Sequence, residues 1–301
     1  SCQCGLTAAR QALLAGLVSP QLRTTTRAVI QAAVNAGIAV GAGLGGLALY
    51  FDTSAAYMAI FVMDAATFLV CAVILRPLPE VAAAVPSAGS KLAVLRDRPY
   101  AVLSLLNMIM LLHVPLITLA TPLWIVRYTD APRWMVSGIL LVNTVSVVLF
   151  QVRVARRVTS LQSATGSMRG AGVMLLVSCG AFALSALGSA GWVAALILLG
   201  AALIQAYGEM MQSAGAWEIS FALAPPDKHG QYQGLFGNGL AVARVIAPLL
   251  LTALILAWGI PGWLVLGAIF LVTSLAFGPA VRWAERTRVT PAAEIPLVSQ
   301  S

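Results

Sequence analysis

The chain has 301 residues, of which 60% are hydrophobic and only 9% are charged, and its formal net charge is +8. A composition this apolar excludes an ordinary soluble domain. Apolar stretches of about 20 residues, the length that a helix needs to cross the hydrocarbon core of a bilayer, recur along almost the whole sequence. We therefore predict an all-α polytopic membrane protein.

About eight transmembrane helices are predicted in chain order, at residues 26–50, 54–75, 100–126, 134–152, 170–187, 192–221, 232–258 and 262–281. Short turn-prone connections separate several of them, such as GSAG at 188–191 and GIPG at 259–262. Such connections favour tight hairpins between consecutive helices.

The basic residues predict the orientation, because Lys and Arg collect in cytoplasmic loops. With the segment before the first helix taken as cytoplasmic, fifteen of the eighteen basic residues fall on that side: Arg10, Arg23, Arg27, Arg76, Lys91, Arg96, Arg98, Arg153, Arg156, Arg157, Arg169, Lys228, Arg282, Arg286 and Arg288. The opposite loops hold only Arg127 and Arg133, and Arg244 lies within a span. The positive net charge is thus a topology signal, and no nucleic-acid partner is needed to explain it.

The chain also contains a loose internal repeat. Residues 27–80 and 232–285, which are 205 positions apart, both run from a basic loop through a long Gly/Ala-rich span, a short turn and an apolar span to a basic exit. Two similar halves are the natural interpretation. Residues 77–98 are the predicted linker between them, and residues 1–20 are similar to the cytoplasmic end of a helix whose beginning is absent.

The strongest functional signal is a polar stripe in the sixth span. Gln205, Glu209 and Gln212 fall at i, i+4 and i+7, so they share one face of a helix over two turns. Intramembrane polar residues need a partner or a water-filled cavity. Two interpretations stay open, a cavity that binds substrate or carries a proton, and a structural hydrogen-bonding stripe between helices.

Three further spans carry polar residues. Glu209 and Arg244 lie on consecutive helices, each about 18 Å along its helix from the loop that joins the two. The sequence therefore predicts an ion pair between them, either as a structural contact or as one that opens during transport. By the same depth argument, Asp64 and Asn35 form a predicted structural hydrogen bond.

The third span combines Asn107, Met110 and His113 with Pro115 and Pro122. Proline-broken membrane helices often line transport sites, so Asn107 is a candidate cavity residue and Met110 a candidate apolar wall. His113 could titrate near neutral pH and take part in proton coupling, although with no spaced partner it does not indicate a metal site.

The first span contains five glycines. Gly37, Gly41 and Gly45 recur every four residues and form one stripe, and Gly46 helps to thin a second face. A stripe without side chains lets a neighbouring helix approach until the backbones touch. We therefore predict a helix–helix contact along it.

Three segments resemble the major facilitator superfamily, and specifically its drug–proton antiporters. GAGLGG at 41–46 is similar to the Gly-Pro-x-x-Gly-Gly motif of their fifth helix, with Ala42 in place of Pro. LAPPDKHGQYQGLFGNG at 223–239 is similar to the cytoplasmic start of the eleventh helix, and QVRVARRV at 151–158 lies where the loop between helices eight and nine is expected.

The resemblance implies that the spans are helices 5–12 of that fold. Residues 1–20 would end a truncated fourth helix, 21–76 would complete the N-terminal half, 77–98 would be the cytoplasmic linker, 99–284 the C-terminal six-helix half, and 285–301 a disordered cytoplasmic tail. In this family the tenth helix lines the central cavity, which favours a cavity role for Gln205, Glu209 and Gln212.

The resemblance further implies a secondary transporter of the plasma membrane that exports small amphiphilic organic molecules, as multidrug efflux antiporters do, by proton coupling and alternating access. No cofactor is expected, and the partners are a small-molecule substrate, protons and the lipid bilayer, with a monomer as the full-length state. The alternatives are a non-transporting fragment, a membrane assembly subunit, or an uptake transporter of the same fold. An enzyme is not expected, because no Walker motif, HExxH motif or nucleophile–base pair occurs in the sequence.

Overall fold

The computed structural model describes residues 18–19, 22–51, 53–76, 93–188, 190–225 and 228–288. Within them the chain is almost wholly helical and has no strand. The elements are α2 (Arg23–Phe51), α3 (Ser54–Leu75), α4 (Ala93–Arg96), α5 (Arg98–Met110), α6 (His113–Pro115), the π-helical turn η2 (Leu116–Ala120), α7 (Thr121–Tyr128), α8 (Met135–Ala155), α9 (Leu161–Leu184), α10 (Gly191–Ala222), α11 (His229–Leu251), the π-helical turn η4 (Thr252–Ala257) and α12 (Ile260–Arg288).

The predicted all-α membrane fold is confirmed. Seven helical segments of the described chain are long and apolar enough to cross a membrane, counting α5 to α7 as one and α11 with η4 as one. The expected first span coincides with α2, a continuous helix of 29 residues that is not among these seven. The predicted span at 54–75 matches α3 at both ends.

The predicted start of one helix was wrong, and helix also occurs in two segments that were predicted to lie outside the spans. The helix expected from residue 170 begins at Leu161, where Ser160 and Ser163 form a capping box, so Arg169 lies inside α9. Residues 93–96 of the predicted linker form α4, and α12 runs to Arg288, beyond the predicted boundary at 284. In each case the prediction assumed that an arginine marks a loop. Membrane helices extend beyond the hydrocarbon core, and their ends can carry arginine. Residues 1–17, 77–92 and 289–301 lie outside the described residues.

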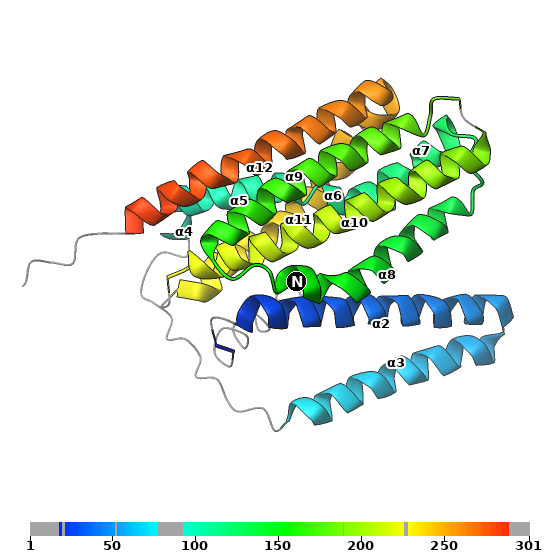
Figure 1. Ribbon diagram of the computed structural model, residues 1–301. Coiled ribbons are helices and arrows are strands. Elements are labelled where there is room, and N and C mark those ends of the chain that lie inside the picture. The colour runs from blue at the N-terminus through cyan, green and yellow to red at the C-terminus, as the bar shows by residue number, and fades with distance from the viewer. Residues whose placement is uncertain are drawn as a thin grey trace, which may run out of the picture.

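Six of the predicted spans form one bundle. In Figure 1, α9, α10, α11, α12 and the segment from α5 to α7 run together along one axis. The helix α10 packs mainly against α9 and α8, and α12 packs mainly against α9 and α5. The core consists of side chains from these helices, among them the fully buried Trp124, Phe182 and Trp263.

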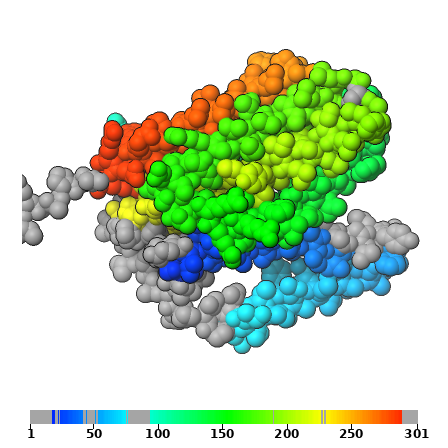
Figure 2. Space-filling view, viewed as in Figure 1, coloured from blue at the N-terminus to red at the C-terminus, as the bar shows by residue number. Residues whose placement is uncertain are grey.

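The two helices before residue 77 lie at one edge of this bundle. The helix α2 packs along α8, and α3 packs against α2 (Figure 1). None of the membrane-length window of α3 is buried inside the described structure, and Figure 2 shows α3 along the lower edge of the molecule. The described contact between the predicted halves is therefore made by α2.

Glycines do bring helices together, but in different helices from the one predicted. A Cβ on Gly172 of α9 would lie 2.4 Å from the Cβ of Ser274 on α12, and a Cβ on Gly208 of α10 would lie 3.1 Å from the Cβ of Met174 on α9. By contrast, a Cβ on Gly37 or Gly41 would meet nothing within 4 Å.

The predicted contact along the α2 stripe is therefore wrong for Gly37 and Gly41 within the described chain. The reason is that no described helix packs closely around this part of α2, since every residue from 37 to 41 is exposed, whereas the fully buried Ala28 lies near the start of the helix. Contacts of the other two predicted stripe positions, Gly45 and Gly46, lie outside the described residues.

Candidate functional site

The polar stripe of α10 faces two neighbouring helices. Gln212 donates from Nε2 to Oδ1 of Asn107 on α5 at 2.8 Å, and both side chains are buried. Gln205 is fully buried and donates from Nε2 to the carbonyl oxygen of His113 at 3.1 Å. These two bonds join α10 to the segment that contains the proline break, so four of the predicted site residues lie together as two pairs.

Glu209 lies between these glutamines in sequence but contacts a different helix. Its Oε2 accepts a hydrogen bond from Nδ2 of Asn143 on α8 at 3.1 Å, and its side chain is part-buried. One turn further along α10, Ser213 accepts a hydrogen bond from Gln151 of α8 at 3.3 Å. The carboxylate of Glu209 is therefore positioned at the α8–α10 contact, about midway along α10.

The helix break beside Gln205 contains two unsatisfied buried polar atoms. His113 Nδ1 lies 2.6 Å from the carbonyl oxygen of Met110, while His113 Nε2 and Gln205 Oε1 have no hydrogen-bond partner among the residues that the structure describes. The break itself follows from Pro115, which lacks an N–H and is followed by the π-helical turn η2. Met110 is fully buried, so in this conformation its side chain packs in the core and is not exposed to a cavity.

Two predicted pairs are not formed. Arg244 is exposed on α11 and makes no ion pair with Glu209, because α10 turns its carboxylate toward α8. Asp64 is exposed on α3 and has no hydrogen bond to Asn35 on α2. In both cases the prediction rested on depth along the helix, and helix rise does not give the direction in which each side chain points.

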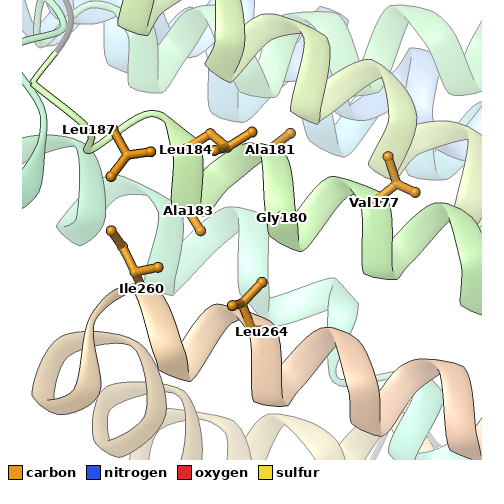
Figure 3. Close-up of a pocket in the computed structure, with 8 residues that line it drawn as sticks. All are labelled: Val177, Gly180, Ala181, Ala183, Leu184, Leu187, Ile260 and Leu264. Atoms are coloured by element: carbon orange, nitrogen blue, oxygen red, sulfur yellow. The ribbon is translucent and has the colours of Figure 1, made fainter.

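An open apolar cavity of about 380 Å³ lies between the end of α9 and the start of α12. Figure 3 shows the side chains around it, which are Val177, Gly180, Ala181, Ala183, Leu184, Leu187, Ile260 and Leu264. None of the polar residues of α10 lines it. In the described residues, no group of three or more His, Cys, Asp and Glu side chains could hold a metal ion.

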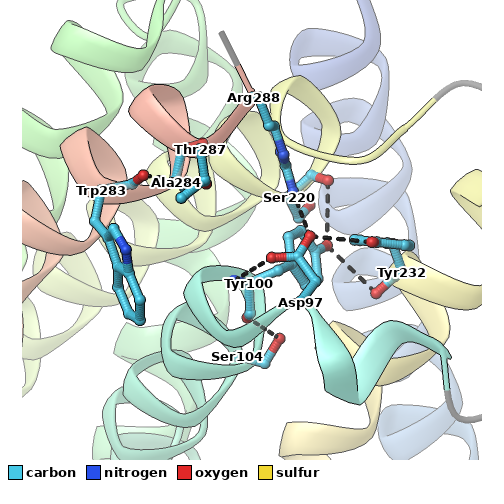
Figure 4. Close-up of polar contacts among 9 residues, drawn as sticks. All are labelled: Asp97, Tyr100, Ser104, Ser220, Tyr232, Trp283, Ala284, Thr287 and Arg288. Carbon is cyan, nitrogen blue, oxygen red and sulfur yellow. Dashed lines mark hydrogen bonds and ion pairs between the residues drawn. The ribbon is translucent and has the colours of Figure 1, made fainter. Parts of the chain in front are cut away.

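A polar cluster ties three helices at the end of the bundle where α5 and α11 begin and α12 ends, which we call the basic end. Asp97 caps α5 by accepting from the Tyr100 backbone N–H at 3.2 Å. The same carboxylate accepts from Tyr232 at 3.0 Å and pairs with Arg288 at 2.9 Å. Figure 4 shows these groups converging on Asp97. The cluster joins α5, α11 and α12.

A second set of contacts at the basic end joins α2 to α10. Thr24 donates to Oε2 of Glu218 at 2.5 Å, and the Arg27 guanidinium lies 5.3 Å from the ring centre of Trp217 and 5.4 Å from that of Phe221. Such cation–π distances are favourable. Because α2 precedes the linker and α10 follows it, these contacts connect the two predicted halves.

Sequence reasoning missed Asn143 and Asp97. Asn143 is an amide near the middle of a predicted span, and an intramembrane polar residue needs a partner or a water-filled cavity, which is the signal that could have found it. Asp97 was assigned to the linker, although an aspartate just before Arg98-Pro99 at a helix start is a common N-cap.

These observations define a polytopic helical membrane protein whose bundle carries a buried polar stripe. The family model of the Major Facilitator Superfamily matches residues 1–248. The chain therefore belongs to this family of membrane transporters.

One solved structure is similar to the chain in fold. It is described as the crystal structure of a bacterial homologue of iron transporter ferroportin in outward-facing state, with a TM-score of 0.58 and 19% sequence identity. The likeness covers 90% of this chain and 66% of that chain, so this chain spans slightly less than two thirds of its length. No curated protein sequence matches the chain.

Proposed function

We propose that the protein is a proton-coupled secondary transporter that exports small amphiphilic organic molecules across the plasma membrane by alternating access, with its C-terminus in the cytoplasm. Membership of the Major Facilitator Superfamily supports transport rather than catalysis. The glycine-rich segment at 41–46, similar to a motif of drug–proton antiporters, supports export. The collection of basic residues on one side supports the orientation.

The observation that carries proton coupling is the position of Glu209. Its carboxylate is part-buried midway along a 32-residue membrane helix and is held by one amide donor, Asn143. An ionisable group at that depth is costly, so such groups are rare in membrane helices and typically mark a transport or proton pathway. In this proposal the carboxylate binds either a proton or the cationic group of a substrate, and the two compete for it.

Protonation of Glu209 has a direct mechanical consequence. A charge-assisted hydrogen bond is roughly twice as strong as a neutral one, so neutralising the carboxylate weakens its bond to Asn143. Asn143 belongs to α8, and α8 is the helix against which α2 of the other half packs. Proton binding at α10 can therefore bias how α8, and with it the contact between the halves, is arranged.

The contacts of α2 with α10 at the basic end form the second part of the mechanism. With Thr24 bonded to Glu218 and Arg27 over Trp217 and Phe221, the halves are joined at that end. Alternating access requires these contacts to separate when the cavity opens toward the cytoplasm. We therefore assign the conformation described here to a state closed at the basic end.

The experiment uses everted membrane vesicles that contain the protein as encoded, including any residues before Ser1. An imposed proton gradient drives accumulation of fluorescent amphiphilic cations such as ethidium in the wild type. The Glu209→Gln variant, which keeps the shape of the side chain, should abolish this accumulation at unchanged protein level. Asp130→Asn, an exposed loop carboxylate, is the matched control and should accumulate the dye normally.

Two outcomes would contradict the proposal. Dye accumulation against the gradient by Glu209→Gln would exclude this carboxylate from coupling. Absence of gradient-driven transport of every cation tested in the wild type would remove the proposed substrate class.

A further inference from the structure

The guanidinium groups of Arg169 on α9 and Arg282 on α12 lie close together at the seam where the two helices pack. If Gly278 of α12 carried a Cβ, that atom would lie 2.6 Å from Nη2 of Arg169 on α9 and 3.6 Å from Nη1 of Arg282 on α12. Those two guanidinium nitrogens are therefore at most 6.2 Å apart. The absence of a side chain at Gly278 is what lets Arg169 lie across the seam.

This pair of like charges is not closed by an ion pair in the described part of the chain. Neither Arg169 nor Arg282 forms an ion pair there, although Glu285 is one turn from Arg282 on the same helix. Both arginines are exposed. Two guanidinium groups held this close without a carboxylate form a site suited to an anion from outside the protein, and their planar donor forks suit a phosphate.

The position of the pair along the bundle points to a lipid. Gly278 lies 18 residues after the start of α12, a rise of about 27 Å, and Arg282 about 33 Å, so the pair straddles the edge of a hydrocarbon core of about 30 Å. Trp283 is 41% exposed, and its indole points away from the Asp97 cluster in Figure 4. Exposed tryptophan is typical of the headgroup level.

The surface next to the pair is apolar. Val173 follows Arg169 by four residues on α9 and is 42% exposed, and Leu275 precedes Arg282 by seven residues on α12 and is 49% exposed. These spacings put each apolar side chain on the helix face of its arginine. A molecule with a phosphate at the arginines and hydrocarbon along Val173 and Leu275 fits both parts of the surface.

We propose that Arg169 and Arg282 bind the phosphate of an anionic phospholipid from the leaflet at the basic end. The site is independent of the transport proposal and of Glu209. It stabilises the packing of α9 on α12, because the bound phosphate places a negative charge between two positive charges that otherwise repel each other across the seam.

The test measures thermal stability of the purified protein in detergent during titration with phosphatidylglycerol or with zwitterionic phosphatidylcholine. The wild type should gain stability from phosphatidylglycerol at concentrations about tenfold or more below those needed in the double variant Arg169→Gln/Arg282→Gln, as expected when charge-assisted hydrogen bonds are lost. The matched control is Arg156→Gln/Arg157→Gln, which removes two exposed charges beyond the end of α8 and should respond like the wild type.

Each arm has an outcome that would overturn the proposal. Equal stabilisation by both lipids in the wild type would show that the headgroup charge is not recognised. Equal loss of response in the two double variants would assign the effect to net charge instead of this site. Stabilisation by inorganic phosphate as strong as that by phosphatidylglycerol would identify a site for the free anion and exclude the lipid.

Discussion

Replacing Gly172 by alanine tests whether the α9–α12 contact depends on the absence of a side chain. The added methyl carbon would lie 1.9 Å from Oγ and 2.4 Å from Cβ of Ser274, and 3.1 Å from the carbonyl oxygen of Phe270. Ordinary contact needs at least about 3.5 Å, so the two helices must separate by about 1 Å or more. Overpacking of this kind costs about 1–3 kcal/mol, which lowers the folding equilibrium constant by about 5- to 150-fold.

Gly180→Ala, on the same helix, is the matched control. A Cβ there meets nothing within 4 Å, and alanine is the better helix former, so this variant should be as stable as the wild type or slightly more stable. We expect the melting temperature of Gly172→Ala in detergent, followed by fluorescence-detected size-exclusion chromatography, to fall by about 2–12 °C. Equal melting temperatures for the two variants would refute the close packing of α9 on α12.

Three further substitutions test the polar contacts. Gln212→Leu leaves the amide of Asn107 buried without its partner and should lower the free energy of unfolding by about 1–3 kcal/mol. The double variant Asn107→Leu/Gln212→Leu should recover much of that loss. A double variant less stable than the sum of the single variants would argue against the bond. Asp97→Asn keeps a capping side chain but loses the part-exposed ion pair with Arg288, so its melting temperature should change little. Asp97→Ala also removes the cap, so its free energy of unfolding should be lower than that of Asp97→Asn by about 1 kcal/mol. Equal effects of the two substitutions would exclude the cap. Trp124→Phe removes an indole donor that lies 3.0 Å from a carbonyl oxygen, and unfolding should become easier by about 1 kcal/mol or more, with unchanged stability as the contradicting result.

The fold could be predicted from hydropathy because each span must be apolar over the thickness of a bilayer, and that requirement is local in sequence. The helix α3 shows this clearly, since both of its ends were predicted to the residue. The boundary of α9 failed because Arg169 was assumed to mark a loop, although a long side chain can reach the headgroup level from inside a helix.

The candidate site could be predicted only in part. The spacing of Gln205 and Gln212 predicts that they share one face of a helix, because helical periodicity can be read from the sequence alone. Both side chains do have polar partners on the neighbouring segment. The choice of partner depends on how helices rotate against each other, which spacing does not encode. Helix rise predicts similar depths for Glu209 and Arg244, yet α10 turns the carboxylate toward Asn143.

The same limit applies to the glycines. Gly37 and Gly41 have the regular spacing expected of a close contact and make none in the described chain, whereas Gly208 and Gly215, seven residues apart on α10, both pack tightly against α9. A small residue permits approach of a neighbouring helix, but the surrounding side chains decide whether a neighbour is there.

The most direct test of the central claim separates proton coupling from substrate movement in proteoliposomes. Glu209→Gln should still exchange labelled for unlabelled ethidium across the membrane at equal pH, because exchange needs no net proton transfer, although it should need a higher ethidium concentration because the cation loses its carboxylate. It should no longer accumulate ethidium when a pH gradient is imposed. Wild-type protein should do both. Gradient-driven accumulation by Glu209→Gln at the wild-type level would contradict the account.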